Sequence, residues 1–203
     1  MAIANLGPAT DPDPFRPPNR FVGLLAGPGA LRPVDAGPPP RRWVDLTAIA
    51  EGFAVSAAGI PELHDRSERA WVLLAVTDLF EAWAIGWPTG GKIDLHDHGP
   101  SSGAIVVASG TLTETTVRSV NRGVAVITTQ HIGPGMSRRF GPRYVHDLVN
   151  DGEQEAISVH VYGPRLSAMS YYRLDGSGRL GVVRTESVPA LGPFDTTSDH
   201  DPS

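Results

Sequence analysis

Cysteine is missing from all 203 residues of the sequence. This absence excludes a disulfide framework, a cysteine nucleophile, an iron–sulfur cluster and any thiolate metal ligand. The N-terminal stretch MAIANLGPATDPDPF also lacks the basic region and the apolar core of a secretory signal. The cytoplasm is therefore the expected compartment.

Long apolar runs and a strong charge of either sign are missing as well. No stretch approaches the roughly 18 continuous apolar residues that a membrane-spanning helix needs. The 17 basic and 22 acidic residues leave a net charge of −5, which gives no reason to expect nucleic acid or a membrane surface as a partner. A chain of this length can bury a full core, and we expect a monomer with one main domain.

The composition divides the chain into three parts. Residues 1–42 hold ten of the 19 prolines, a density that sustains neither a helix nor a central strand, and they are predicted to form an extended arm. Residues 43–185 are predicted to form the folded domain. Residues 186–203, rich in small and polar residues, are predicted to be a disordered tail.

Helices are expected only at the start of the domain. Residues 44–58 place Val44, Ile49, Phe53 and other apolar residues at roughly helical spacing. Residues 61–76 are predicted to form a second helix, because Pro61 suits a first turn and an apolar patch follows at its end.

From Phe80 onward the pattern changes to short β-branched runs. These runs are AWAIGW, AIVVAS, TLTETTV, VAVITT and AISVHVY, and turn signals such as PTGG, NRG, GPG and NDGE separate them. Such a pattern is typical of an antiparallel barrel or sandwich. The expected fold class is therefore mainly β, a barrel with short N-terminal helices.

Three histidines form a candidate metal site. His96 and His98 lie in DLHDHG, where a spacing of two places both rings on one face of an extended chain. His146 follows in RYVHDLVN, on another short strand. Neutral imidazole is the commonest protein ligand of first-row metals, and three of them leave open positions on the ion. A pair of histidines satisfied by local contacts is the alternative.

A second polar set lies on the strand AISVHVYGP. Ser158, His160 and Tyr162 alternate along it and so share one face. A hydroxyl, an imidazole and a phenol in this order can form a hydrogen-bonded relay that ends on the tyrosine hydroxyl. The alternative is the wet face of a half-buried strand.

The spacing around the histidines resembles the two motifs of the cupin superfamily. The first, G(x)5HxH(x)4E(x)6G, is matched except that Gly103 stands where the glutamate is expected. The second is matched loosely by Gly135, Pro142, His146 and Asn150, and Tyr144 replaces its second glycine. Without the glutamate, the predicted site has no charged ligand, which suits an anionic thiolate bound beside O2. A zinc hydrolase also remains open, although Asp94 and Asp97, its candidate bases, are expected on the opposite face of the strand.

In combination, these segments resemble the bacterial cysteine dioxygenases, thiol dioxygenases of the cupin superfamily. The resemblance is carried by residues 96–115, by VHDLVN, and by SVHVYGP with the following YYRLDGSGRL, and it covers roughly residues 65–185. It implies a jelly-roll-like β-barrel in which His96, His98 and His146 bind Fe(II). It also implies that Ser158, His160 and Tyr162 form the triad beside the iron.

The implied reaction inserts both atoms of O2 into a thiolate to give a sulfinate, with L-cysteine as substrate. Dioxygenation of 3-mercaptopropionate or another small thiol is an alternative within the class. A non-catalytic, metal-binding cupin is the alternative outside it.

At two positions the chain departs from the pattern of this family. Animal members carry a cysteine at the position of Gly103, cross-linked to the tyrosine that matches Tyr162, whereas bacterial members commonly have glycine. The family also places an arginine upstream of the first histidine to bind the substrate carboxylate, and the matching positions, 70–72, hold no basic residue. The candidates for this role are Arg69, just outside that window, and Arg165 and Arg173, which follow Tyr162.

Overall fold

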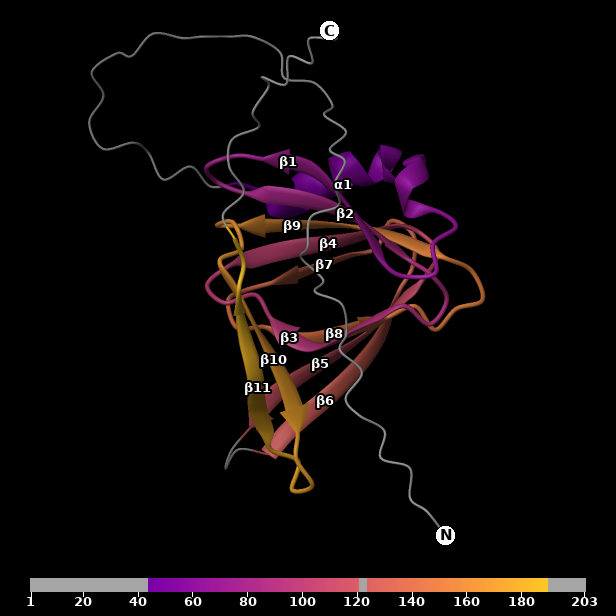
Figure 1. Cartoon of the computed structure of the whole chain (residues 1–203). Helices are drawn as coiled ribbons and strands as arrows, with labels where there is room; N and C mark the ends of the chain where they lie inside the picture. Colours follow the sequence, from indigo (N-terminus) through magenta and orange to yellow (C-terminus); the bar gives the residue numbers. More distant parts are fainter. Residues whose placement is uncertain (1–43, 121–123, 190–203) are drawn as a thin grey trace, which may run out of the picture.

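The computed structural model describes residues 44–120 and 124–189, which form two antiparallel sheets that face each other (Figure 1). The helical elements are α1 (Leu46–Ala57) and the 3-10 turn η1 (Pro61–Leu63). The strands are β1 (Ala70–Val76), β2 (Glu81–Trp87), β3 (Lys92–Asp97), β4 (Ser102–Ser109), β5 (Leu112–Val120), β6 (Val124–Ile132), β7 (Ser137–Phe140), β8 (Val145–Val149), β9 (Ala156–Gly163), β10 (Ala168–Leu174) and β11 (Leu180–Ser187). One sheet has the order β1-β2-β9-β4-β7 and the other β11-β10-β3-β8-β5-β6.

The helix α1 covers the outer face of the five-stranded sheet (Figure 1). Asp45 caps its first turn, where the side-chain oxygen accepts hydrogen bonds from the backbone N–H groups of Thr47 and Ala48. Ala50 and Ala57 are fully buried against the sheet. The helix predicted over residues 44–58 is confirmed.

The second predicted helix, over residues 61–76, is wrong. Only the 3-10 turn η1 is helical there, and residues 70–76 form β1, which pairs antiparallel with β2. Trp71 packs between the two sheets, whereas Val72 packs on the side of the helix. A strand that is covered on both faces reads as a continuous apolar run and shows no clear period, so the sequence alone does not separate it from a helix. The domain therefore begins with one α-helix instead of two.

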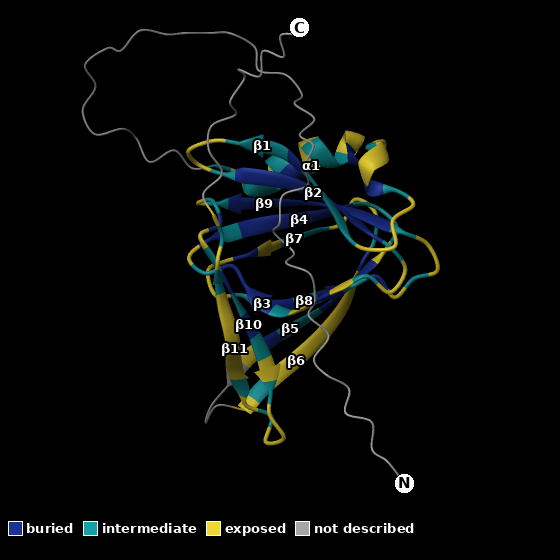
Figure 2. Ribbon diagram, viewed as in Figure 1, coloured by how far each residue is buried: buried dark blue, intermediate teal, exposed yellow. Residues whose placement is uncertain are grey.

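The β-strands predicted from Phe80 onward are confirmed. β9 is buried along almost its whole length, as are β2 and β4 beside it (Figure 2). Alternate residues of β9 point to opposite faces of the sheet, one covered by α1 and the other facing the second sheet. Ile157, Val159 and Val161 pack toward α1, whereas Tyr162 packs in the core between the two sheets. Because a strand alternates its faces, Ser158 and His160 turn with Tyr162 toward the barrel interior.

The predicted arm, residues 1–42, lies outside the described residues, as do residues 190–203 of the predicted tail. β11 extends to Ser187, so the first two residues of the predicted tail, Glu186 and Ser187, lie in a strand. Within the described ranges, no helix has both the length and the apolar character needed to cross a bilayer.

Candidate metal centre

The three predicted ligand histidines meet inside the barrel on the six-stranded sheet. β3 carries His96, the turn after it carries His98, and β8 carries His146, which is the cross-strand neighbour of His96. All three are buried, and one nitrogen of each lies within 4.8 Å of the others. The structure therefore brings the predicted ligands together.

The nitrogen atoms of these residues fit a metal ion. The Nε2 atoms of His96 and His98 are 3.1 Å apart, and two nitrogen ligands at right angles on one ion, with bonds of about 2.1 Å, lie about 3.0 Å apart. The Nε2 atom of His146 is buried and has no hydrogen-bond partner within the described chain. Burial lowers the pKa of His96 and of His98 well below the usual value, so both rings are neutral and able to bind a metal.

Each histidine is held in a different way. His96 donates its Nδ1 hydrogen to the backbone oxygen of Asp94 (2.9 Å), which leaves Nε2 for the ion. The ring of His98 stacks on Phe140, with ring centres 4.8 Å apart and planes at 26°. His146 donates from Nδ1 to a carboxylate oxygen of Glu114 (2.8 Å). His146 is thus the ligand supported by a charged group.

Glu114 is a residue of the site that the sequence reasoning missed. The motif glutamate is absent at Gly103, but Glu114 supplies a carboxylate one hydrogen bond away from the ligands. Its side chain is only 1% exposed, and it also accepts a hydrogen bond from the Tyr144 hydroxyl (3.3 Å). The sequence does hold one indication of this position. Glu114 is two residues after the buried Leu112 in the same strand, so both side chains point into the core.

The predicted relay of Ser158, His160 and Tyr162 is present as a hydrogen-bonded chain. The Ser158 hydroxyl lies 2.8 Å from Nε2 of His160, and Nδ1 of His160 lies 3.2 Å from the Tyr162 hydroxyl. Trp87, a second residue that the sequence reasoning missed, extends this chain, because its indole N–H donates to the Ser158 oxygen (2.8 Å). When Ser158 donates its own hydrogen to Nε2 of His160, Nδ1 of His160 carries the ring hydrogen and donates it to the Tyr162 oxygen. The hydrogen of the Tyr162 hydroxyl is then available to another acceptor.

Burial keeps this relay uncharged. It lowers the pKa of His160 to about 3 and raises the pKa of Tyr162 above its usual value. The imidazole therefore stays neutral and the phenol stays protonated at neutral pH.

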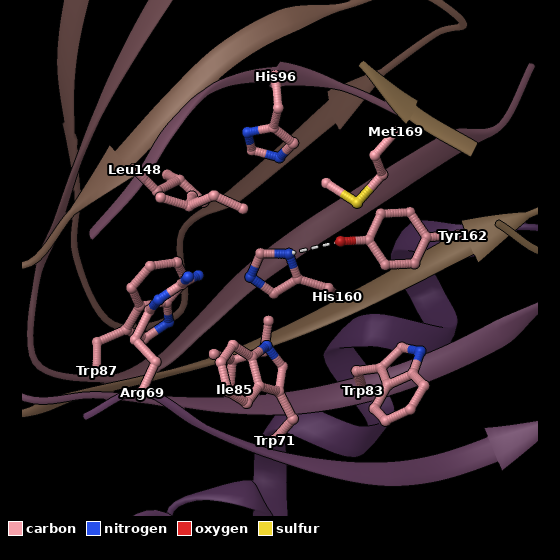
Figure 3. Close-up of a pocket in the computed structure, with 11 residues that line it drawn as sticks. Arg69, Trp71, Trp83, Ile85, Trp87, His96, Leu148, His160, Tyr162 and Met169 are labelled. Carbon is pink, nitrogen blue, oxygen red and sulfur yellow. Dashed lines mark hydrogen bonds between the residues drawn. The ribbon is translucent and has the colours of Figure 1, made fainter. Parts of the chain in front are cut away.

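A small cavity of about 20 Å³, roughly the space of one water molecule, adjoins His96, His160 and Tyr162. Figure 3 shows the sulfur of Met169 beside Tyr162, and the Arg69 side chain beside Trp87. The remaining lining residues are Trp71, Trp83, Ile85, Ile93 and Leu148. The wall is thus mostly apolar.

Of the three candidate arginines, Arg69 lines this cavity. Its guanidinium carbon lies 5.0 Å from the ring centre of Trp71 and 5.2 Å from that of Trp87, within the range of cation–π attraction. Arg69 precedes β1 and shares the face of Trp71, because alternate residues of an extended chain point the same way. Arg165 does not line the cavity, and Arg173 is exposed on a groove elsewhere on the six-stranded sheet.

The two candidate bases of a zinc hydrolase do not line the cavity. The Asp97 carboxylate accepts hydrogen bonds from the Tyr172 hydroxyl (2.6 Å) and from the backbone N–H of Gly99 (3.0 Å). Asp94 is exposed and lies 3.8 Å from the Lys92 ammonium. Neither carboxylate therefore belongs to the wall of the cavity.

Residues 57–174 match the family described as cysteine dioxygenase type I. The chain belongs to this family. Its two antiparallel sheets form the β-barrel of the cupins, as the sequence predicted.

Three solved structures illustrate what the chain is similar to. An oxalate oxidase in complex with glycolate is 19% identical, with a TM-score of 0.42, and the match covers 51% of this chain and 52% of that one. The cupin domain of Cnp3 from Schizosaccharomyces pombe is 12% identical, with a TM-score of 0.40 and coverages of 47% and 60%. A conserved protein with a double-stranded β-helix domain from Klebsiella pneumoniae is 19% identical, with a TM-score of 0.39 and coverages of 58% and 86%.

In this member of the cysteine dioxygenase type I family, Gly103 is required by packing. It lies between Tyr162 and Phe140 in the sheet. A Cβ atom at this position would lie 2.2 Å from the Phe140 ring and 2.8 Å from the backbone oxygen of Val161. Phe140 thus occupies the space that a cysteine would need to reach Tyr162.

Proposed function

We propose that this protein is an Fe(II)-dependent thiol dioxygenase that converts L-cysteine and O2 to cysteine sulfinate. The observation that carries the proposal is the cavity itself. It combines the His96 side of the three-histidine centre, the Tyr162 end of the relay and the Arg69 guanidinium. A metal, an acid hydrogen and a cation are the groups that a thiol carboxylate and O2 require.

The reaction of a thiolate with O2 to give a sulfinate balances without a further reductant. A thiolate and O2 give a sulfinate, in which the O–O bond is broken and two S–O bonds are formed. The sulfur loses four electrons and the two oxygen atoms take them up. Iron(II), when bound by His96, His98 and His146, would supply open coordination positions for the thiolate and O2 and would mediate this electron transfer.

Arg69 is proposed to bind the substrate carboxylate. A guanidinium pairs with a carboxylate through two parallel hydrogen bonds, which fixes the substrate in orientation as well as in place. The Trp71 and Trp87 rings hold the guanidinium at the cavity wall. The thiol end of a short substrate is then directed away from Arg69, toward the histidines.

Tyr162 is proposed to donate its hydroxyl hydrogen to the sulfur or to an oxygen as the S–O bonds form. The relay is proposed to run from Ser158 through His160 to the Tyr162 oxygen, which leaves this hydrogen for the substrate. The apolar wall excludes water, which strengthens each of these polar contacts.

A specific observation favours 3-mercaptopropionate as a second candidate substrate. None of the residues that line the cavity is acidic. A substrate ammonium group would therefore find no carboxylate partner. The amine of cysteine would have to bind at the metal instead. Because 3-mercaptopropionate keeps the thiol and the carboxylate but lacks the amine, it fits the same contacts.

The test is aerobic turnover by protein loaded with Fe(II) under nitrogen. Cysteine, cysteamine and 3-mercaptopropionate are supplied in turn, and sulfinate is measured by mass spectrometry with ¹⁸O₂ as a label. Two labelled oxygen atoms in one sulfinate are expected. Metal binding without sulfinate from any of the three thiols would instead identify a non-catalytic, metal-binding cupin.

The variant Arg69→Met tests the role of the arginine. Loss of a charged hydrogen-bonding group costs about 1.5–3 kcal/mol, so kcat/KM for the thiols with a carboxylate is expected to fall roughly 10- to 100-fold. Turnover of cysteamine, which has no carboxylate, is expected to change little. The exposed Arg173→Met is the matched control. An equal loss for all three thiols would show that Arg69 does not bind the carboxylate.

A further inference from the structure

Three charged or polar side chains, none of which lines the cavity, meet beside His146. The carboxylate of Glu114 accepts from Nδ1 of His146 (2.8 Å) and from the Tyr144 hydroxyl (3.3 Å). Its other oxygen lies 3.5 Å from Nε of Arg138. The Glu114 side chain is 1% exposed and that of Arg138 is 22% exposed, so solvent screens the carboxylate little.

The pair of Glu114 and Arg138 joins the two sheets. Glu114 lies on β5 in the six-stranded sheet, and Arg138 lies on β7, at the edge of the five-stranded sheet. His146 is a diagonal cross-strand neighbour of Glu114, because Thr116 stands directly opposite His146. The Glu114 carboxylate thus faces His146 on its own sheet and the positive charge of Arg138 on the other sheet.

We propose that Glu114 is a positioning residue that sets the donor strength of His146 toward the bound metal, and that Arg138 limits this effect. A carboxylate that accepts from one ring nitrogen fixes the tautomer and makes the opposite nitrogen a stronger donor. His96 has only a backbone carbonyl in this role, and His98 is held by ring stacking. His146 is therefore the ligand through which the protein adjusts the electron density on the metal.

The two charges act in opposite directions. Removal of the negative charge at Glu114 weakens His146 as a donor, which disfavours the ferric state and raises the reduction potential. Removal of the positive charge at Arg138 leaves the carboxylate uncompensated, strengthens the donor and lowers the potential. A purely structural role does not predict opposite signs.

The experiment compares Glu114→Gln, Arg138→Met and Tyr144→Phe with the wild type. The amide oxygen of glutamine can still accept from His146, so the first variant removes mainly the charge. Fe(II) affinity is measured anaerobically by competition with a chromophoric chelator, and the potential of the bound iron by spectroelectrochemistry. Glu114→Gln is expected to weaken binding roughly 10- to 100-fold and to raise the potential.

Arg138→Met is expected to lower the potential and to keep Fe(II) binding at least as tight as in the wild type. Tyr144→Phe, which keeps both charges, is the control and is expected to change either quantity by less than the other two variants do. Equal potentials in all four proteins, or shifts of the same sign in the two charge variants, would overturn the inference. If Glu114→Gln does not fold, Arg138→Met alone tests the inference. A reduction potential in Arg138→Met that is not lower than in the wild type would then overturn it.

The inference depends only on metal binding by the three histidines, and the same measurements separate the two proposals. If the wild-type protein bound no Fe(II), the metal centre itself would fail, and the inference would fail with it. If the predicted shifts occurred without sulfinate formation, the proposed dioxygenase function alone would fail.

Discussion

At the scale of single residues, Phe140 organises the aromatic side of the centre. Its ring stacks on His98 and on Tyr144, and it lies 6.1 Å from the ring of Tyr162. The absence of a side chain at Gly103 leaves room for it. His98 of the candidate metal centre and Tyr162 of the relay therefore share Phe140 as a packing neighbour.

The variant Gly103→Ala is expected to be destabilised by overpacking. The new methyl group would lie 2.2 Å from a carbon atom of the Phe140 ring, and overpacking of this kind costs about 1–3 kcal/mol. Urea unfolding measures the loss, and a weaker Fe(II) affinity is expected with it, since the ring that stacks on His98 must shift. Gly141→Ala is the control, because a Cβ atom there has nothing within 4 Å. Equal stability of the two variants would contradict this account.

At the scale of elements, the segment that leads into β1 is tied to the connection between β8 and β9. The imidazole of His64 pairs through Nδ1 with the Glu155 carboxylate and through Nε2 with the backbone oxygen of Ala58 (2.8 Å). The backbone N–H of Asp65 donates to the other oxygen of Glu155 (3.2 Å). Arg69 follows a few residues later, so this contact holds the start of the segment that carries the arginine to the cavity.

The variant Glu155→Gln is expected to change the pH dependence of unfolding. The hydrogen bond to Glu155 raises the pKa of His64, so the stability that the pair contributes is fully present below the ordinary histidine pKa, about 6.5, and is lost as the pH rises through the raised value. The same hydrogen bond lowers the pKa of Glu155, so the contribution is also lost in acid, as the pH falls through that lowered value. Urea midpoints are therefore expected to differ most between the wild type and the variant in mildly acidic solution.

Above the raised pKa of His64, the two midpoints are expected to converge. Glu153→Gln, an exposed carboxylate two residues away, is the control and is expected to follow the wild type at every pH. A constant difference between wild type and Glu155→Gln from acid to alkaline pH would show that protonation of His64 is not involved.

At the scale of the whole molecule, the two sheets contribute different parts of the site. The six-stranded sheet supplies the three histidines of the candidate metal centre, whereas the five-stranded sheet supplies the relay from β9 and the arginine that precedes β1. The metal would join β3 to β8, and the substrate would lie between the two layers. The site therefore exists only when both sheets are packed together.

Metal removal is expected to lower the melting temperature. An ion at 100 times its dissociation constant stabilises the folded state by about 2.7 kcal/mol, which for a domain of this size corresponds to roughly 5–11 °C. Calorimetry of the Fe(II)-loaded and the chelated protein under nitrogen measures the difference. In the control variant His146→Ala, Fe(II) is expected to give a much smaller shift. The same shift in that variant would place the ion elsewhere.

By itself, the sequence determined the β character of the domain and the two polar sets within it. The β-branched runs and the turn signals between them depend on local preferences, and the spacings around His96 and along β9 depend only on the alternation of an extended chain. These features are local, so they can be read without knowledge of which strands pair.

Only the tertiary structure decided the rest. That residues 70–76 are a strand follows from their cover on both faces, which local pattern does not reveal. That Arg69 lines the cavity follows from the path of that same strand. The contacts of Glu114 with His146 and of Trp87 with Ser158 join residues far apart in the chain. Such contacts depend on strand register and on the packing of one sheet on the other, and both arise only when the chain folds.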